Sequence, residues 1–180
     1  MELKGSKTES NLMSAFAGES QARNKYSYYA SKAKKDGYEQ IAAIFEETAN
    51  NEKEHAKLWF KELHNGEVPS TEANLEDAIK GETYEYDGMY PTFAQEAKEE
   101  GFDRIADLFT KVGEIEKHHA ERYQKLLDNI KNNEVFHKEE ETIWICRNCG
   151  YVYVGKDALS VCPVCKHPES FMEVKANNYN

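Results

Sequence analysis

Two Glu-x-x-His pairs are the residues in this sequence whose types and spacing most clearly predict chemistry. The first pair is Glu52 and His55, and the second is Glu116 and His119. Residues three apart on an α-helix lie on the same face. Each pair would therefore present one carboxylate oxygen and one imidazole nitrogen to the same point, which is a donor set that binds divalent metal ions.

Two further carboxylates complete a predicted ligand set. Glu19 and Glu82 each lie on the predicted helix that precedes a Glu-x-x-His pair. One Glu from each of two helices, with Glu-x-x-His from each of the other two, is the ligand pattern of ferritin-like di-iron bundles. Four carboxylates at one point would repel one another unless two divalent cations neutralised them. The alternative to a metal site is that these are ordinary surface residues on charged helices. That alternative requires two Glu-x-x-His pairs at repeat-related positions to arise by chance.

Three residues are secondary candidates. Glu85 follows Glu82 by three positions and would face the same centre, whereas the position 64 residues earlier is the neutral Gln21. We interpret Glu85 as an extra ligand to one iron in one oxidation state, with an exposed carboxylate as the alternative. Tyr26 and Tyr90 are candidate hydrogen-bond donors to the site, with plain packing inside the bundle as the alternative for both.

Four long helices are predicted to position these residues. Helix-forming segments run over residues 6–36, 38–65, 71–100 and 102–131, and the third is interrupted by Gly81, Gly88 and Pro91. A shift of 64 residues aligns the segment that begins at Ala33 with the one that begins at Ala97, although Glu19 and Glu82 match only with an offset of one residue. Two copies of a helical hairpin related by a pseudo-two-fold axis are therefore expected to form a four-helix bundle.

All four cysteines lie in the last segment, as C-x2-C, twelve residues and C-x2-C: Cys146, Cys149, Cys162 and Cys165. This spacing predicts a tetrahedral thiolate site, and it does not choose between zinc and iron. A redox site elsewhere in the chain favours one iron ion, because turnover needs an electron carrier. We expect a helical domain over residues 1–130, a linker over 131–142 and a small β-rich domain over 143–180, which has too little core to fold without metal.

The composition excludes some classes of partner. The net charge of −10 argues against nucleic acid, since phosphate binding needs clustered Lys and Arg. No stretch approaches the roughly 20 apolar residues that span a bilayer, so no membrane contact is expected. The N-terminal segment MELKGSKTES lacks a signal-peptide pattern, and we therefore expect a cytoplasmic protein.

The segments AFAGESQARNKY, ETANNEKEHAK, KGETYEYDGMYPTFA and WICRNCGYVY resemble the rubrerythrins, and the resemblance covers nearly the whole chain. It implies a non-haem di-iron peroxidase that reduces hydrogen peroxide, with a rubredoxin-like C-terminal domain that delivers electrons. It also implies that one iron exchanges His55 for Glu85 as its oxidation state changes. The di-iron ligands that it implies are Glu19, Glu52, Glu82, Glu85, Glu116, His55 and His119. One departure is Lys166, which stands after the second cysteine pair where free-standing rubredoxins usually have Gly.

Our first functional hypothesis is a peroxidase that receives electrons from an NAD(P)H-linked reductase or a rubredoxin. We expect a homodimer or a larger homo-oligomer, and the short connector between the second and third helices allows hairpins to be exchanged between subunits. The first alternative is iron oxidation and storage, because storage bundles share these ligands. The second alternative is an oxygenase that acts on an organic substrate.

Overall fold

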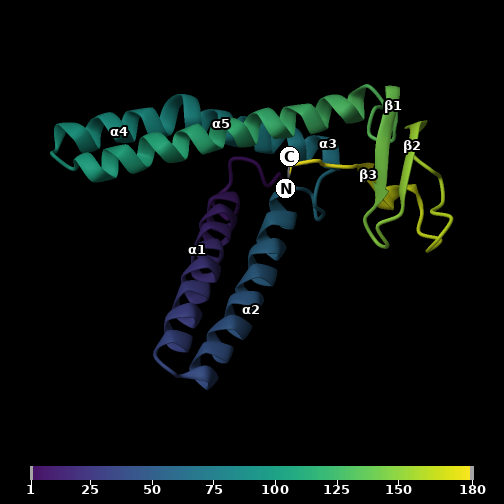
Figure 1. Cartoon of the computed structure of the whole chain (residues 1–180). Helices are drawn as coiled ribbons and strands as arrows, with labels where there is room; N and C mark the ends of the chain where they lie inside the picture. Colours follow the sequence, from purple (N-terminus) through teal and green to yellow (C-terminus); the bar gives the residue numbers. More distant parts are fainter. Residues whose placement is uncertain (1, 179–180) are drawn as a thin grey trace. The chain divides into compact units, whose positions relative to one another are not determined.

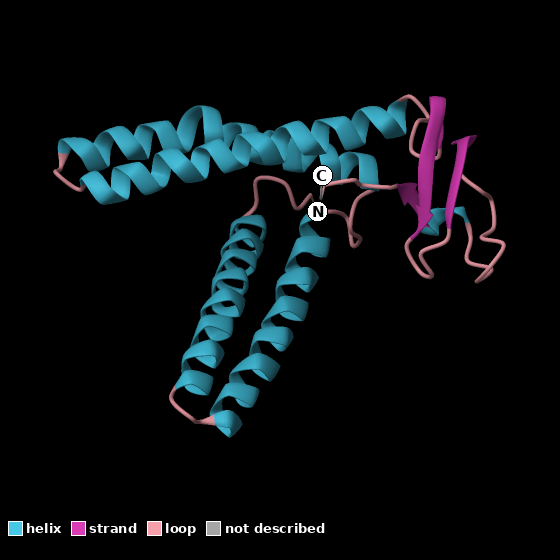
Figure 2. Cartoon of the chain, in the orientation of Figure 1, coloured by secondary structure: helices cyan, strands magenta, loops and turns pink. Residues whose placement is uncertain are grey.

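The computed structural model describes residues 2–178 and divides into two compact units, Met1–Pro69 and Ser70–Asn180 (Figure 1). The first unit is a helical hairpin. The second unit contains another helical hairpin and a small antiparallel sheet (Figure 2). Within the described residues, none of the helices has the length and apolar character that crossing a membrane would require.

The first hairpin pairs α1 (Lys7–Lys35) with α2 (Glu39–Leu63). Ser6 caps α1, because its hydroxyl accepts a hydrogen bond from the Glu9 backbone N–H at 3.1 Å. The turn between the helices contains Gly37 at a φ of 84°, a left-handed conformation that Gly adopts without steric cost. The buried side chains between the helices are small: Ala30, Ala33, Ala42, Ala49 and Ala56.

The second hairpin has the same plan with one interruption. Its first arm is α3 (Thr71–Tyr84), the π-helical turn η1 (Glu85–Met89) and α4 (Tyr90–Glu99), and its second arm is α5 (Asp103–Lys131). The arms meet at Gly101, whose φ of 86° matches that of Gly37 in the first hairpin. Of the three predicted breaks in this arm, only Gly88 lies in an interruption, the π-helical turn, whereas Gly81 and Pro91 lie within α3 and α4.

Each hairpin leaves several large apolar side chains exposed. In α2 they include Ile41, Ile44 and Leu58, and in α5 they include Ile105, Leu108 and Ile115. Two of the pairs, 41 with 105 and 44 with 108, are related by the internal repeat. An apolar stripe that remains beside a pair of helices is the surface that a four-helix bundle buries.

The small domain is a three-stranded antiparallel sheet with the strand order β2-β1-β3. Its strands are β1 (His137–Cys146), β2 (Val152–Asp157) and β3 (Met172–Val174), and the short helix η2 (Glu169–Phe171) precedes the third strand. Trp144 is fully buried at the centre, and its indole N–H donates to the Gly155 carbonyl at 2.9 Å.

The first strand begins earlier than the sequence pattern predicts, inside the segment 131–142 that we expected to be a linker. His137 pairs with Asp157, and the register then shifts before regular pairing resumes at Thr142. The intervening residues are charged and mostly exposed, so they show no apolar alternation. A bulged, charged start of a strand carries no periodic signal that sequence analysis could detect.

Candidate metal centres

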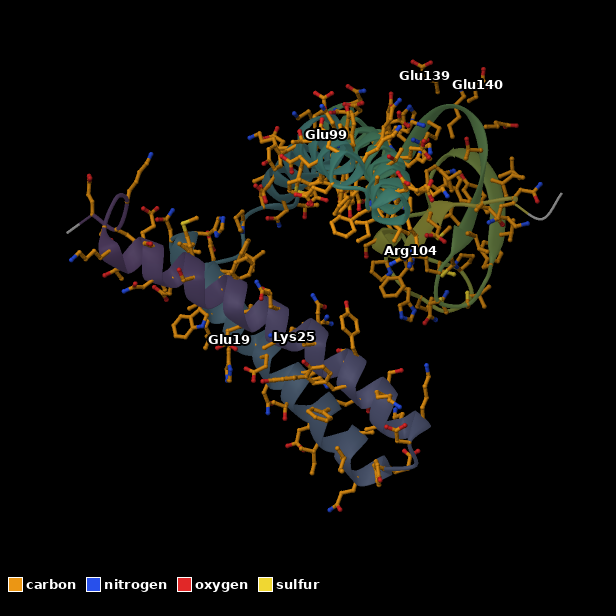
Figure 3. All side chains as sticks on the ribbon, turned by 90° about the vertical axis from the view of Figure 1, so that its left-hand side faces the viewer. Glu19, Lys25, Glu99, Arg104, Glu139 and Glu140 are labelled. Carbon is orange, nitrogen blue, oxygen red and sulfur yellow. The ribbon has the colours of Figure 1, made fainter. Side chains whose placement is uncertain are left out.

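The α1–α2 hairpin brings three of the predicted ligands together. Glu19 lies near the middle of α1 (Figure 3), and it faces Glu52 and His55 on α2. The His55 Nδ1 atom lies 2.9 Å from Glu52 Oε2 and 3.8 Å from Glu19 Oε1. One ligand atom from each of the three residues lies within 4.8 Å of the others, which is a spacing that one cation could bridge. We call this group the first half-site.

The second unit repeats the arrangement with Glu82 on α3 and with Glu116 and His119 on α5. The His119 Nδ1 atom lies 2.6 Å from Glu116 Oε2 and 3.6 Å from Glu82 Oε2. Glu52 and Glu116 are the least exposed members of the two groups, with 16% and 15% of their side chains accessible. We call this group the second half-site. The structure therefore places the six residues in two matching groups of three, one in each unit.

One carboxylate of each half-site, Glu19 in the first and Glu82 in the second, has a raised pKa. A hydrogen bond to Glu52, together with burial and the Glu52 charge, raises the pKa of Glu19. Burial, followed by the charge of Glu116 and a hydrogen bond to it, raises the pKa of Glu82. A crowded carboxylate pair needs either a shared proton or a cation. The donor set and its electrostatics therefore fit divalent metal ions, which would replace these protons.

Glu85 and Tyr90 both lie beside the second half-site. Burial raises the pKa of the Tyr90 phenol, and the charges of Glu85, Glu116 and Glu82 raise it further. The Tyr90 Cβ packs so closely on α5 that a Cβ added at Gly113 would lie only 3.2 Å from it. Tyr90 therefore remains a neutral phenol held at a fixed place near these carboxylates.

The environment of Tyr26 is aromatic. Its ring centroid lies 6.1 Å from those of Tyr29 and Phe45, which matches the packing alternative named for this residue. Tyr90 has a similar neighbour in Phe109, at 6.0 Å. The two tyrosines thus occupy equivalent packing positions in the two hairpins.

The π-helical turn η1 explains the one-residue offset in the internal repeat. Seven residues separate Glu19 from Tyr26, which corresponds to two α-helical turns and one helix face. Eight residues separate Glu82 from Tyr90, and an uninterrupted α-helix would rotate Tyr90 to another face. The Tyr90 N–H instead donates to the Glu85 carbonyl five residues back, so the extra residue is absorbed. Sequence analysis showed the offset but did not identify this turn.

The four cysteines converge as predicted from their spacing. Cys146 Sγ lies 3.6 Å from Cys165 Sγ, and Cys149 Sγ lies 3.7 Å from Cys162 Sγ. Cys146 and Cys162 are buried, whereas Cys149 is exposed. All four sulfur atoms lie within 4.8 Å of one another, as a tetrahedral thiolate site requires.

Backbone N–H groups prepare this cluster for a cation. A hydrogen bond from the His167 N–H, opposed by burial, lowers the pKa of Cys165 to about 5. The Tyr151 N–H favours the Cys149 thiolate, but burial and the neighbouring sulfur atoms raise the pKa of that thiol to about 12. One thiolate therefore forms readily and the next forms only at high pH. A bound cation removes this conflict because it stabilises all four thiolates together.

The two cysteine knuckles have the same backbone turn with different residues. Gly150 follows the first pair at a φ of 76°, and Lys166 follows the second at a φ of 62°. The Lys166 N–H donates to the Cys162 carbonyl at 3.0 Å, as the Gly150 N–H does to Cys146 at 2.8 Å. Lys166 therefore adopts the left-handed conformation that Gly would favour, and the departure noted in the sequence leaves the knuckle geometry intact.

Comparisons with known proteins agree with both centres. A family model described as Rubrerythrin matches residues 10–127, and one described as the rubredoxin-like domain of rubrerythrin matches residues 144–173. The chain is 47% identical to Rubrerythrin-1 of Clostridium acetobutylicum, with 98% of both chains covered. It is 46% identical to the rubrerythrin of Nitratidesulfovibrio vulgaris, again with 98% of both covered. A solved structure of nigerythrin in a mixed-valence state is 34% identical, with 96% of this chain and 91% of that chain covered and a TM-score of 0.35.

Proposed function

This chain belongs to the rubrerythrin family, and from that premise we propose that it is a peroxidase that reduces hydrogen peroxide to water. As a member of that family it is an oxidoreductase with a ferritin-like helical part, a di-iron site and a rubredoxin-like four-cysteine site. The observation that supports the proposal is the presence in one chain of two Glu/His half-sites and a four-cysteine site. A two-electron reaction centre and a one-electron carrier are the parts that peroxide reduction needs.

We assign the di-iron ligands to the two half-sites and Glu85: Glu19, Glu52, His55, Glu82, Glu85, Glu116 and His119. When bound, the two iron ions supply the two electrons that cleavage of the O–O bond requires. The carboxylates offset the positive charge of the metals. Tyr90 holds a proton on a half-buried phenol beside Glu85, so it can donate a hydrogen bond to a developing anion at this place. The overall reaction consumes one peroxide, two electrons and two protons, and it releases two water molecules.

Electrons are proposed to enter through the four-cysteine centre, loaded with one iron ion. Cys149 is exposed while Cys146 and Cys162 are buried, so this centre meets solvent at one corner, where a donor can approach. The proposed donor is an NAD(P)H-linked reductase or a rubredoxin. Four free thiols in two C-x2-C pairs suit a reducing compartment, and we propose the cytoplasm.

The functional unit is proposed to be at least a homodimer. Each unit of the chain holds one half-site, so the complete ligand set requires two hairpins to meet, either from one chain or from two. The segment between α2 and α3 is short, running only from His64 to Ser70. Exchange of hairpins between two chains would satisfy both half-sites in a closed symmetric assembly. Sedimentation of the full chain should show a dimer or larger species, and a fully active monomer would contradict this assignment.

Steady-state consumption of peroxide tests the proposed activity. The full chain loaded with iron, together with a reductase and reduced nicotinamide, should remove hydrogen peroxide and oxidise one nicotinamide for each peroxide consumed. Storage remains the competing function, because storage bundles share the carboxylate and histidine ligands. A large hollow assembly that takes up many ferric ions per chain, with no peroxide turnover, would favour storage instead.

Glu85→Gln is expected to keep both iron ions but to lower peroxide turnover by roughly tenfold to a hundredfold. Glu85 is the carboxylate that the other half of the repeat lacks, and oxidised iron favours a hard anionic oxygen where reduced iron accepts a neutral imidazole. Glu99→Gln is the matched control, because Glu99 is exposed and accepts a hydrogen bond only from its neighbour Gln95. Structures of the oxidised and reduced forms provide the direct check. Glu85 and His55 in the same positions in both states would exclude a ligand exchange.

A further inference from the structure

The indole N–H of Trp59 is a buried donor without an acceptor. It is the one buried side-chain nitrogen or oxygen within residues 2–178 that lacks a hydrogen-bond partner. Buried polar groups in folded proteins nearly always have a partner, so each exception needs an explanation. The other indole in the chain shows that the fold can satisfy such a group, since Trp144 donates to the Gly155 carbonyl at 2.9 Å.

Trp59 lies at the edge of the first half-site. It follows His55 by four residues on α2, so the two side chains share one face of that helix. The next residue, Phe60, packs on Phe16 of α1 at a centroid distance of 5.6 Å, and Phe16 precedes Glu19 by three residues. The stretches of α1 and α2 beside Glu19 are therefore held together by aromatic packing next to the indole.

The Trp59 indole N–H lies near the Glu19 carboxyl but does not form a hydrogen bond with it. The Trp59 N–H lies close enough to favour the ionised carboxyl and so to lower the pKa of Glu19, against the larger effects of Glu52 and burial. The same N–H falls short of hydrogen-bond geometry. Glu19 instead faces Glu52 and His55, and one ligand atom of each of the three lies within 4.8 Å of the others. A carboxylate that gives one oxygen to a cation keeps its other oxygen available to accept a hydrogen bond from a donor beside the site.

We propose that Trp59 is a positioning residue that donates its indole N–H to the Glu19 carboxylate when metal occupies the site. This inference rests on the proposed ligand role of Glu19. Carboxylates that bind metals are commonly held by such outer hydrogen bonds, which fix their orientation. An indole suits the place because it is a donor only, so it can neither ionise nor bind the metal itself.

The internal repeat places a different residue at the equivalent position of the second half-site, so only the first half-site has an indole donor there. The position 64 residues after Trp59 is Tyr123 on α5, which has a phenol in place of the indole. A phenol can donate, accept or lose its proton, so it could act as a ligand in its own right. The first half-site thus has a fixed donor at the position where the second has a titratable group. Trp59 on one side and Glu85 on the other make the two iron positions chemically different.

The indole resonances of the full chain test this inference directly. Zinc, which is diamagnetic, is added first to fill the four-cysteine site and then to fill the carboxylate site, with metal content measured on the same sample. The Trp59 indole proton should move downfield and exchange more slowly with water at the second step, while the Trp144 signal stays in place. Trp59→Phe identifies the signal by its loss. An unmoved Trp59 signal with the carboxylate site full would overturn the proposal.

Zinc affinity gives an independent readout that involves no turnover. Trp59→Phe should weaken binding at the carboxylate site by roughly tenfold or more, measured by competition with a chelator. Tyr123→Phe, the matched change in the other half of the repeat, should bind zinc within about twofold of the native chain if the support is one-sided. Native affinity in Trp59→Phe would overturn the positioning role. Native affinity in Glu19→Ala would instead overturn the ligand assignment on which the proposal rests, and neither result depends on the peroxidase activity.

Discussion

Cys149→Ser and Cys162→Ser are each expected to reduce nicotinamide-linked peroxide turnover to the background rate while both helical hairpins stay folded. All four cysteines lie in one small domain, and the helical hairpins contain none. Serine is a poor ligand for a metal that needs four thiolates. Because this domain has too little core to fold without metal, both substitutions should unfold it, and the change at the fully buried Cys162 also disturbs its core.

The measurement compares peroxide consumption with the iron content of the same samples. Both variants should lose one iron ion of about three per chain and keep the di-iron pair. Lys156→Ala is the control, since it changes an exposed side chain of the same domain away from the sulfur atoms. Full activity in either cysteine variant would mean that electrons reach the di-iron site directly and that the four-cysteine site is only a structural metal site.

Glu52→Ala is expected to lose the di-iron pair and with it all peroxide turnover. Glu52 is the most buried member of the first half-site, and it contacts His55 at 2.9 Å and shares a hydrogen bond with Glu19. Without it, two ligands remain in that half-site, and the half-exposed His55 loses the carboxylate that orients it. Iron analysis should find about one ion per chain, the one held by the cysteines.

Glu54→Ala is the matched control for this change. Glu54 lies two residues away on the same helix, and its carboxylate pairs only with the exposed side chains of Lys53 and Lys57. This variant should retain native iron content and native turnover, because exposed ion pairs contribute little to stability. A full complement of three iron ions in Glu52→Ala would show that the half-site is assigned to the wrong residues.

The chemistry of the centres could be predicted from the sequence because it depends on local spacing. Glu52 and His55 share a helix face for the same reason that any residues three apart do. The cysteine pairs likewise have a spacing that only a few backbone turns can produce, and the protein has those turns at Gly150 and Lys166. The family resemblance added the identity of the metals, which spacing alone leaves open.

Other features depend on packing that no local pattern reveals. The one-residue offset between Glu82 and Tyr90 was visible in the sequence, but the π-helical turn that absorbs it, which places Tyr90 close to Gly113 of α5, was not. The start of β1 at His137 depends on a pairing with Asp157, twenty residues away in the chain. The unpaired indole of Trp59 likewise appears only when α1 and α2 are packed together.

The most direct test of the peroxidase assignment is a single-turnover experiment with the fully reduced, iron-loaded chain. The protein is mixed without oxygen with one equivalent of hydrogen peroxide, and separately with dissolved oxygen, while the residual oxidant and the oxidation of the iron centres are followed. We predict that peroxide is consumed to water at least about ten times faster than oxygen, with the cysteine centre oxidised after the carboxylate centre. Faster reaction with oxygen, with peroxide released as a product, would contradict the assignment and favour an iron-oxidising protein.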